Sequence, residues 1–93
     1  MTYRIKLKKD FKISELKKDY NMYFHKDNRI WGVGEPNQKT EYALLIAYRE
    51  IVYNEEMYKK HKQFIDNFIK DLENRGYLEE NQSEDNNVYH LVM

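Results

Sequence analysis

The stretch from residue 37 to residue 78 is nearly half of this 93-residue chain, and its sequence is typical of an almost unbroken helical block. It carries most of the large apolar side chains, so it must supply most of the hydrophobic core. We predict two helices within it, one over about residues 38–54 and the next starting after Asn54. The first should be the more deeply buried, because apolar residues surround much of its surface.

The second helix has the clearest periodic pattern in the chain. Mostly apolar residues recur at the i, i+3, i+4, i+7 spacing of one helix face, namely Met57, His61, Phe64, Ile65, Phe68, Ile69 and Leu72. Asn54 can cap its first turn, where Glu55 and Glu56 also suit the helix dipole. Gly76 occupies the position of a C-terminal cap.

The rest of the chain predicts strands and one short helix. Apolar and polar residues alternate over 2–7, which indicates a half-buried strand. Ser14 can cap a short helix, and residues 22–34 should form a hairpin whose turn covers 26–29. Residues 88–93 have apolar side chains on both faces of a final strand, which could pair with the first strand.

Together these elements predict an α+β fold in a single domain over residues 1–93. A short N-terminal helix, a β-hairpin and edge strands would pack on two longer C-terminal helices. An aromatic content of 15% argues against a disordered chain, although 34% of the residues are charged. A chain of this size builds one core and leaves little room for an enclosed active-site cleft.

The residue types present exclude several classes of site. Disulfides, thiolate zinc sites and cysteine nucleophiles are ruled out because the chain has no cysteine. The segment GVGEPNQKT at 32–40 lacks the glycines that a phosphate-binding loop needs before its lysine. His25, His61 and His90 lie on different predicted elements, without the spacing of metal ligands. We therefore predict no metal, no cofactor and no enzymatic activity.

The net charge is zero, but basic and acidic residues are unevenly distributed along the chain. Residues 1–31 hold nine lysines and arginines against four acids, whereas residues 73–93 hold one against five. Aromatic residues lie among the N-terminal basic residues, a combination found in proteins that bind RNA or single strands. We favour the simpler interpretation that strand alternation buries the aromatic side chains and leaves the lysines in water.

The many tyrosines are the best indication of a protein partner. Within the predicted helices, Tyr42, Tyr53 and Tyr58 cannot all face the core together with Leu44 and Ile51, so some must be exposed. Tyrosine and tryptophan commonly anchor protein interfaces. Our candidate protein interface therefore comprises Tyr23, Trp31, Tyr42, Tyr53 and Tyr58. A core that uses tyrosine as a filler would explain these residues equally well.

The run from Phe64 to Met93 has the order of a winged helix, in which a helix, a glycine, a polar tip and a strand follow one another. In that fold the helix enters the major groove of duplex DNA. Candidate nucleic-acid contacts on the exposed side of helix 57–75 are Lys59, Lys60, Lys62, Gln63, Asn67, Lys70 and Asn74. The acidic tip after Gly76 argues against this interpretation, because it would repel phosphate.

We predict a small non-enzymatic protein-binding module that modulates or inhibits a larger protein or nucleoprotein complex. Accessory proteins of phages and mobile elements, such as inhibitors of host defence, have this profile. The alternatives are a winged-helix DNA-binding transcriptional regulator that contacts duplex DNA and, for assembly, a homodimer. Because there is neither a long apolar run nor a secretory leader pattern, we expect a cytoplasmic protein that makes no membrane contact.

Overall fold

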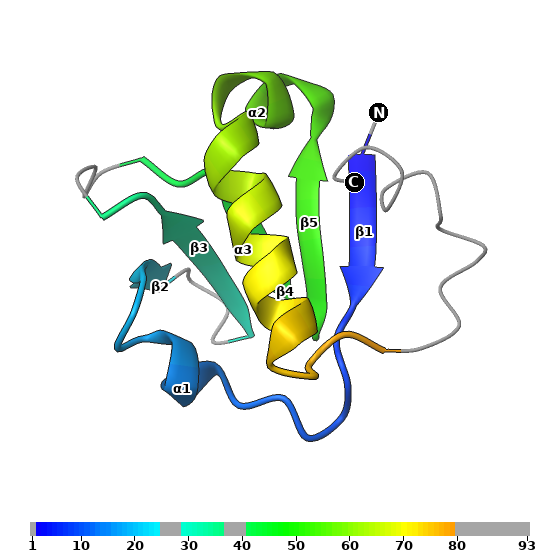
Figure 1. Ribbon diagram of the computed structural model, residues 1–93. Helices are drawn as coiled ribbons and strands as arrows, with labels where there is room; N and C mark the ends of the chain where they lie inside the picture. The colour runs from blue at the N-terminus through cyan, green and yellow to red at the C-terminus, as the bar shows by residue number, and fades with distance from the viewer. Residues whose placement is uncertain (1, 25–28, 37–40, 80–93) are drawn as a thin grey trace.

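The computed structural model describes residues 2–24, 29–36 and 41–79, and its centre is a five-stranded antiparallel sheet (Figure 1). The strands are β1 (Thr2–Lys6), β2 (Asn21–Phe24), β3 (Ile30–Gly34), β4 (Leu44–Ala47) and β5 (Glu50–Asn54). Their order across the sheet is β1-β5-β4-β3-β2. Strands β2 to β5 therefore form a meander, and β1 is added at the edge beside β5.

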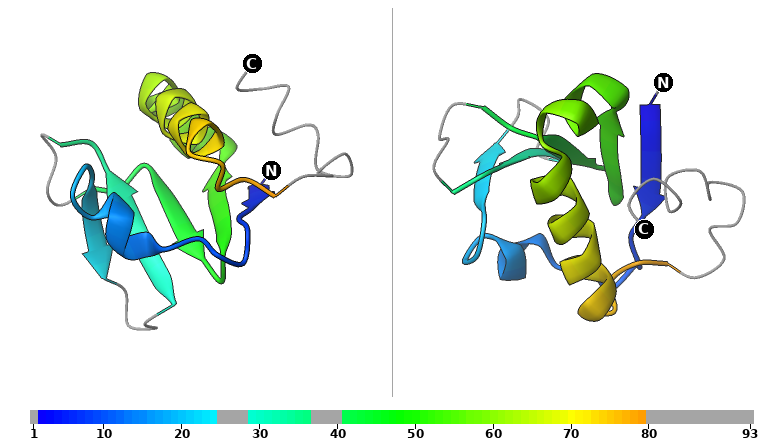
Figure 2. Two further views of the ribbon diagram at one scale, coloured as in Figure 1. Left: turned by 60° about the horizontal axis from the view of Figure 1, so that its bottom comes forward. Right: turned by 45° about the horizontal axis from the view of Figure 1, so that its top comes forward.

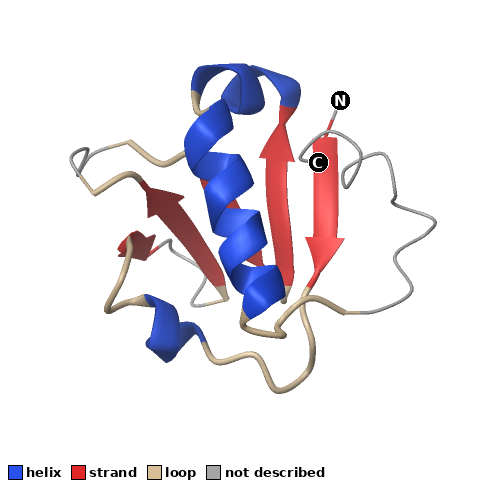
Figure 3. Cartoon of the chain, viewed as in Figure 1, coloured by secondary structure: helices blue, strands red, loops and turns tan. Residues whose placement is uncertain are grey.

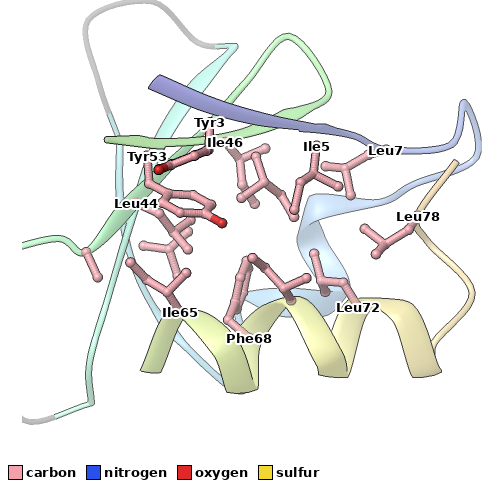
Figure 4. Packing of buried hydrophobic residues seen from close by; sticks show 14 of the residues in the cluster. Tyr3, Ile5, Leu7, Leu44, Ile46, Tyr53, Ile65, Phe68, Leu72 and Leu78 are labelled. Atoms are coloured by element: carbon pink, nitrogen blue, oxygen red, sulfur yellow. The ribbon is translucent and has the colours of Figure 1, made fainter. Parts of the chain in front are cut away.

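The helices in this part of the chain are α1 (Ile13–Leu16), α2 (Glu55–Lys60) and α3 (Lys62–Asn74), and only α3 is long (Figure 3). It lies across one face of the sheet (Figure 2). Alternate apolar side chains of β1, β5 and β4 point toward it, and Ile65, Phe68 and Leu72 of α3 point back toward the strands (Figure 4). All three of these α3 side chains are fully buried. This contact between one helix and one sheet face makes the core.

The prediction of a buried helix over 38–54, and with it of two longer C-terminal helices, was wrong. Residues 44–54 are instead the antiparallel hairpin of β4 and β5. Leu44 and Ile46 are buried under α3, whereas Leu45 and Val52 are half-buried on the opposite face of the sheet. An apolar run of this kind fits either a buried helix or a strand with two apolar faces. The β-branched residues of this hairpin favour the strand.

The turn between β4 and β5 explains why the sequence concealed this hairpin. Tyr48 and Arg49 connect the two strands, and both have a positive φ, of 52° and 65°. Two successive positive φ values belong to a type I′ turn, which normally contains Asn-Gly or Asp-Gly. The left-handed conformation costs a residue with a side chain roughly 1–2 kcal/mol. No glycine, proline, asparagine or aspartate marks this turn in the sequence.

Several local predictions are confirmed. The first strand and the hairpin of β2 and β3 are present, and the Asn54 side chain accepts a hydrogen bond from the backbone N–H of Met57 at 2.7 Å. Gly76 has a φ of 78°, and its N–H and that of Tyr77 bond back to the last turn of α3 as in a Schellman cap. The prediction that Ser14 caps the short helix was wrong, because Ser14 lies inside α1 and the N-cap is Lys12.

Some predictions fall on residues outside the described ranges. These are the final strand over 88–93, its pairing with β1, and most of the β2–β3 turn. Within the described ranges, Leu78 forms an isolated antiparallel bridge with Leu7 just after β1. Helices in these ranges are too short and too polar to span a bilayer.

Gly32 and Tyr42 provide a test of the sheet geometry. A Cβ atom at Gly32 would lie 2.9 Å from Cγ and Cδ1 of Tyr42, which is closer than non-bonded carbons approach. Gly32→Ala should therefore lower the free energy of unfolding by about 1–3 kcal/mol, the usual cost of overpacking. Urea denaturation of Gly32→Ala, Tyr42→Ala and the double variant measures the coupling. If Gly32→Ala costs as much without the Tyr42 ring as with it, this close approach is not the cause.

Candidate binding groove

The five residues of the predicted protein interface lie in three different places. Tyr53 and Tyr58 are in the core, with only 1% and 8% of their surface exposed. The Tyr53 ring packs against Tyr58, with centroids 5.8 Å apart, and the Tyr58 hydroxyl donates to Asp66. Burial raises the pKa of Tyr53 above its ordinary value. These two side chains therefore build the fold rather than its surface.

Tyr23 and Tyr42 are half-buried on the face of the sheet opposite α3. Tyr23 pairs with Gly32, and Tyr42 lies over the same glycine. Trp31 pairs with Ile46, so its side chain lies on the same side of the sheet as α3. The structure thus separates Trp31 from the other four predicted residues. Trp31 lines an open groove instead.

An open groove lies where α1 and the loop before it face the ends of β3 and β4. Its apolar lining consists of Phe11, Ile13, Trp31 and Ile46, and its other lining residues are Arg29, Tyr48 and Arg49. We call these seven residues the aromatic–arginine groove. Its volume of about 480 Å³ is within the range of small-ligand sites. Because none of the seven is acidic, the groove has a positive character.

Cations lie over the aromatic rings of this groove. The Nζ atom of Lys17 is 4.2 Å from the Trp31 ring centroid, and the guanidinium carbon of Arg29 is 5.9 Å from that of Tyr48. Phe24 packs edge-on against Trp31, with centroids 5.1 Å apart. Phe24 and Tyr48 are 58% and 54% exposed. Large exposed apolar side chains beside one groove are typical of a binding surface, whereas single scattered ones are not.

A polar network holds the α1 side of this groove against the C-terminal part of α3. Arg75 contacts Asp19 at 2.8 Å and Asp71 at 3.1 Å, and the Tyr20 hydroxyl donates to Asp71. Burial and the hydrogen bond to Asp71 both raise the pKa of Tyr20. Burial alone would raise the pKa of Asp71, but hydrogen bonds from Arg75 and Tyr20 outweigh it and lower that pKa. The network fixes the segment that carries Phe11 and Ile13.

The lowered pKa of Asp71 predicts how stability changes with pH. A carboxyl whose pKa is lower in the folded than in the unfolded state stabilises the fold above its ordinary value of 3.8 and loses that effect as pH falls through the folded value. Asp71→Asn should therefore cost about 1 kcal/mol at neutral pH. Urea titrations from pH 7 to pH 2 should show this difference vanishing at the acid end. Asp10→Asn, at an exposed position, is the control, and an equal loss at every pH would contradict the assignment.

The turn of Tyr48 and Arg49 should be replaceable by a more stable one. Tyr48→Asn combined with Arg49→Gly supplies the residues that a type I′ turn prefers and should raise the free energy of unfolding by about 1–2 kcal/mol. The backbone carbonyl of Arg49, which accepts from Leu7 N–H at 2.8 Å, is retained in this variant. Thermal denaturation followed by circular dichroism measures the gain. A loss of stability would mean that the two side chains themselves hold the hairpin together.

A second polar cluster surrounds His61 at the junction of α2 and α3. The histidine is 6% exposed, its Nδ1 is 3.2 Å from a Glu35 oxygen and its Nε2 is 3.5 Å from a Glu41 oxygen. Glu41 also contacts Lys60, and this hydrogen bond lowers the pKa of Glu41. Since Glu35 and Glu41 flank the β3–β4 connection, His61 ties that connection to the helices. Among the described residues, no group of three or more His, Cys, Asp or Glu side chains is placed to hold a metal ion.

The candidate nucleic-acid contacts all lie on the exposed surface of α2, α3 and their junction. Acidic residues neutralise part of this surface, since Lys60 pairs with Glu41 and Lys62 pairs with Asp66 at 3.1 Å. A helix-turn-helix also needs a first helix that crosses the DNA backbone. Residues 44–54, which precede the predicted recognition helix, form a β-hairpin, so this part of the fold does not supply that first helix.

Sequence reasoning found Trp31 but missed most of the groove. The helix predicted over 38–54 contains Ile46, Tyr48 and Arg49, and the sequence gives no functional role to Phe11 or Ile13. The available signal was chemical: an arginine next to a tyrosine at the end of an apolar run. Only the hairpin pairing brings these residues beside Trp31.

A scan of protein-family models and searches of curated proteins and solved structures found no match to this chain.

Proposed function

We propose that this chain is a non-enzymatic binding module that docks on a larger protein or nucleoprotein complex and modulates or inhibits it. The aromatic–arginine groove is the docking site in this proposal. Such a role fits accessory proteins of phages and mobile elements, including inhibitors of host defence.

The observation that carries the proposal is the grouping of exposed aromatic and arginine side chains around one apolar groove. Tyrosine, tryptophan and arginine contribute most of the binding free energy at many protein interfaces. Here Trp31 comes from β3, Tyr48 and Arg49 come from the β4–β5 turn, and Phe24 extends the apolar surface beyond them. The open shape suits a partner's protruding side chains better than it would enclose a reacting substrate.

The environment of the buried histidine also favours binding over catalysis. A general base needs a nitrogen directed at the proton it removes. The two ring nitrogens of His61 face the carboxylates of Glu35 and Glu41, which connect the β3–β4 segment to the helices. His61 does not line the aromatic–arginine groove. In this proposal, His61 therefore holds the β3–β4 connection against the helices and transfers no proton.

Site-specific photo-crosslinking tests the proposal. A photoreactive amino acid at Tyr48 or Phe24 should capture one protein from a lysate of the source organism, whereas the same group at Gln63, on the outer surface of α3, should not. Trp31→Ala should reduce the capture at Phe24 at least tenfold, because buried tryptophan anchors are commonly worth about 2 kcal/mol or more. Equal capture from Gln63, or no effect of Trp31→Ala, would contradict the groove as the docking site.

Duplex DNA binding is the competing hypothesis, and the same variants separate it. A regulator that reads DNA would crosslink DNA from Gln63, bind duplex at low salt, and lose affinity steeply as salt rises. Loss of that binding in a Lys59→Gln, Lys62→Gln and Lys70→Gln variant would assign it to the helices. Under the proposal, this triple variant retains full capture of the partner through Tyr48.

A further inference from the structure

We infer that the aromatic–arginine groove recognises an acidic segment of a partner protein that carries one bulky apolar side chain. The apolar side chain would enter between Trp31, Ile46 and the α1 side of the groove, and carboxylates on either side of it would reach Arg29 and Arg49. This inference rests on the proposed function and specifies the chemistry of its partner.

The lining residues define the apolar half of this ligand. Phe11, Ile13, Trp31 and Ile46 offer only carbon surface and the indole N–H, and the volume of about 480 Å³ accommodates a leucine or phenylalanine side chain with adjoining backbone. Phe11 and Ile13 pack against the core from outside, so they are held in place before any ligand arrives. A preformed apolar slot lowers the entropic cost of binding.

The charges define the other half. Arg49 is exposed, and its guanidinium forms no ion pair with any residue in the described ranges. Its neighbour Glu50 is engaged with Arg4, at 3.4 Å. Guanidinium groups bind carboxylates through paired, charge-assisted hydrogen bonds. At the edge of the groove, Arg49 therefore offers a positive charge that no residue in the described ranges neutralises.

The arrangement of cations over the rings favours a protein segment over a single-stranded nucleic acid. Single-strand binding proteins use aromatic rings as platforms on which bases stack, which requires an open ring face. Lys17 covers a face of Trp31, and Arg29 covers a face of Tyr48. An apolar side chain needs only contact with the rim of these rings, and carboxylates can meet the same cations from outside.

The strained turn is an independent observation for the same site. Tyr48 and Arg49 occupy left-handed positions where asparagine and glycine would be more stable. Residues held in such conformations are concentrated at binding and active sites. Replacing Tyr48 and Arg49 with asparagine and glycine would remove an aromatic ring from the groove. It would also remove the guanidinium that binds carboxylate in this proposal.

Trp31 allows a direct binding experiment, because it is the single tryptophan of the chain and lies in the groove. Its fluorescence is titrated with peptides of about ten residues that have a central leucine or phenylalanine between aspartates and glutamates. Saturable binding with a shifted emission maximum is expected. Matched peptides with asparagine and glutamine in place of the acids, or with a central serine, should bind at least tenfold more weakly. Equal binding of the neutral peptides would overturn the inference.

Variants assign the binding to the two arginines. Arg49→Gln and Arg29→Gln should each weaken binding of the acidic peptide about twofold to fivefold, as expected for partly exposed ion pairs. Arg4→Gln, on the opposite face of the sheet, removes the same charge and should change the affinity by less than twofold. The double variant Tyr48→Asn and Arg49→Gly should be folded and more stable, yet bind more weakly. Unchanged binding by that variant would overturn the inference. Because the variant is expected to be more stable, misfolding would not explain weaker binding.

The remaining outcomes are also decisive. If an oligothymidylate of about twelve nucleotides binds more tightly than the acidic peptide, the ligand is a single-stranded nucleic acid and the inference of a protein segment is wrong. If no acidic peptide binds but crosslinking from Tyr48 still captures a partner, the proposed function stands and the acidic motif is wrong. If acidic peptides bind but crosslinking captures nothing, the groove chemistry stands and the docking role is lost.

Discussion

The rest of the structure depends on how one amphipathic helix covers one face of the sheet. The buried stripe of α3 packs on the alternate residues of β1, β5 and β4 that face it (Figure 4). A helix of 13 residues is only about 20 Å long, so it cannot cover the whole face of a five-stranded sheet. The uncovered end, where β3 begins and β4 finishes, is bordered by α1 instead. The aromatic–arginine groove lies at this end, between α1 with the loop before it and the ends of β3 and β4.

Elements with a complete local signal could be predicted from the sequence. The stripe of α3, the Asn54 cap and the Gly76 cap follow from spacing and residue type alone. The hairpin of β4 and β5 could not be predicted in this way. Its apolar residues occupy both faces, which removes the two-residue alternation, and its turn contains Tyr48 and Arg49 in place of asparagine and glycine. Tertiary packing, rather than local preference, selects the strands there.

The candidate site was less predictable than the fold because it is assembled from distant segments. Trp31 was identified by its type, but tyrosines chosen for the same reason, Tyr53 and Tyr58, proved to be core residues. The predicted helix over 38–54 assigned the wrong faces to the residues of β4 and β5. The correct register pairs Trp31 with Ile46 and brings the turn beside α1, and that register depends on contacts that no short stretch of sequence contains.

The hairpin turn that misled the sequence prediction is also the centre of the candidate site. A turn selected only for stability would use the residues that tolerate a positive φ without strain. This one places a tyrosine that is 54% exposed and an arginine without an ion partner in the described ranges on the edge of an apolar groove. Local strain of this kind persists when the surrounding fold enforces it, as the flanking ladder and the bond from Leu7 to the Arg49 carbonyl do here. In our proposal, the stability given up at this turn is the cost of presenting these two side chains to the partner.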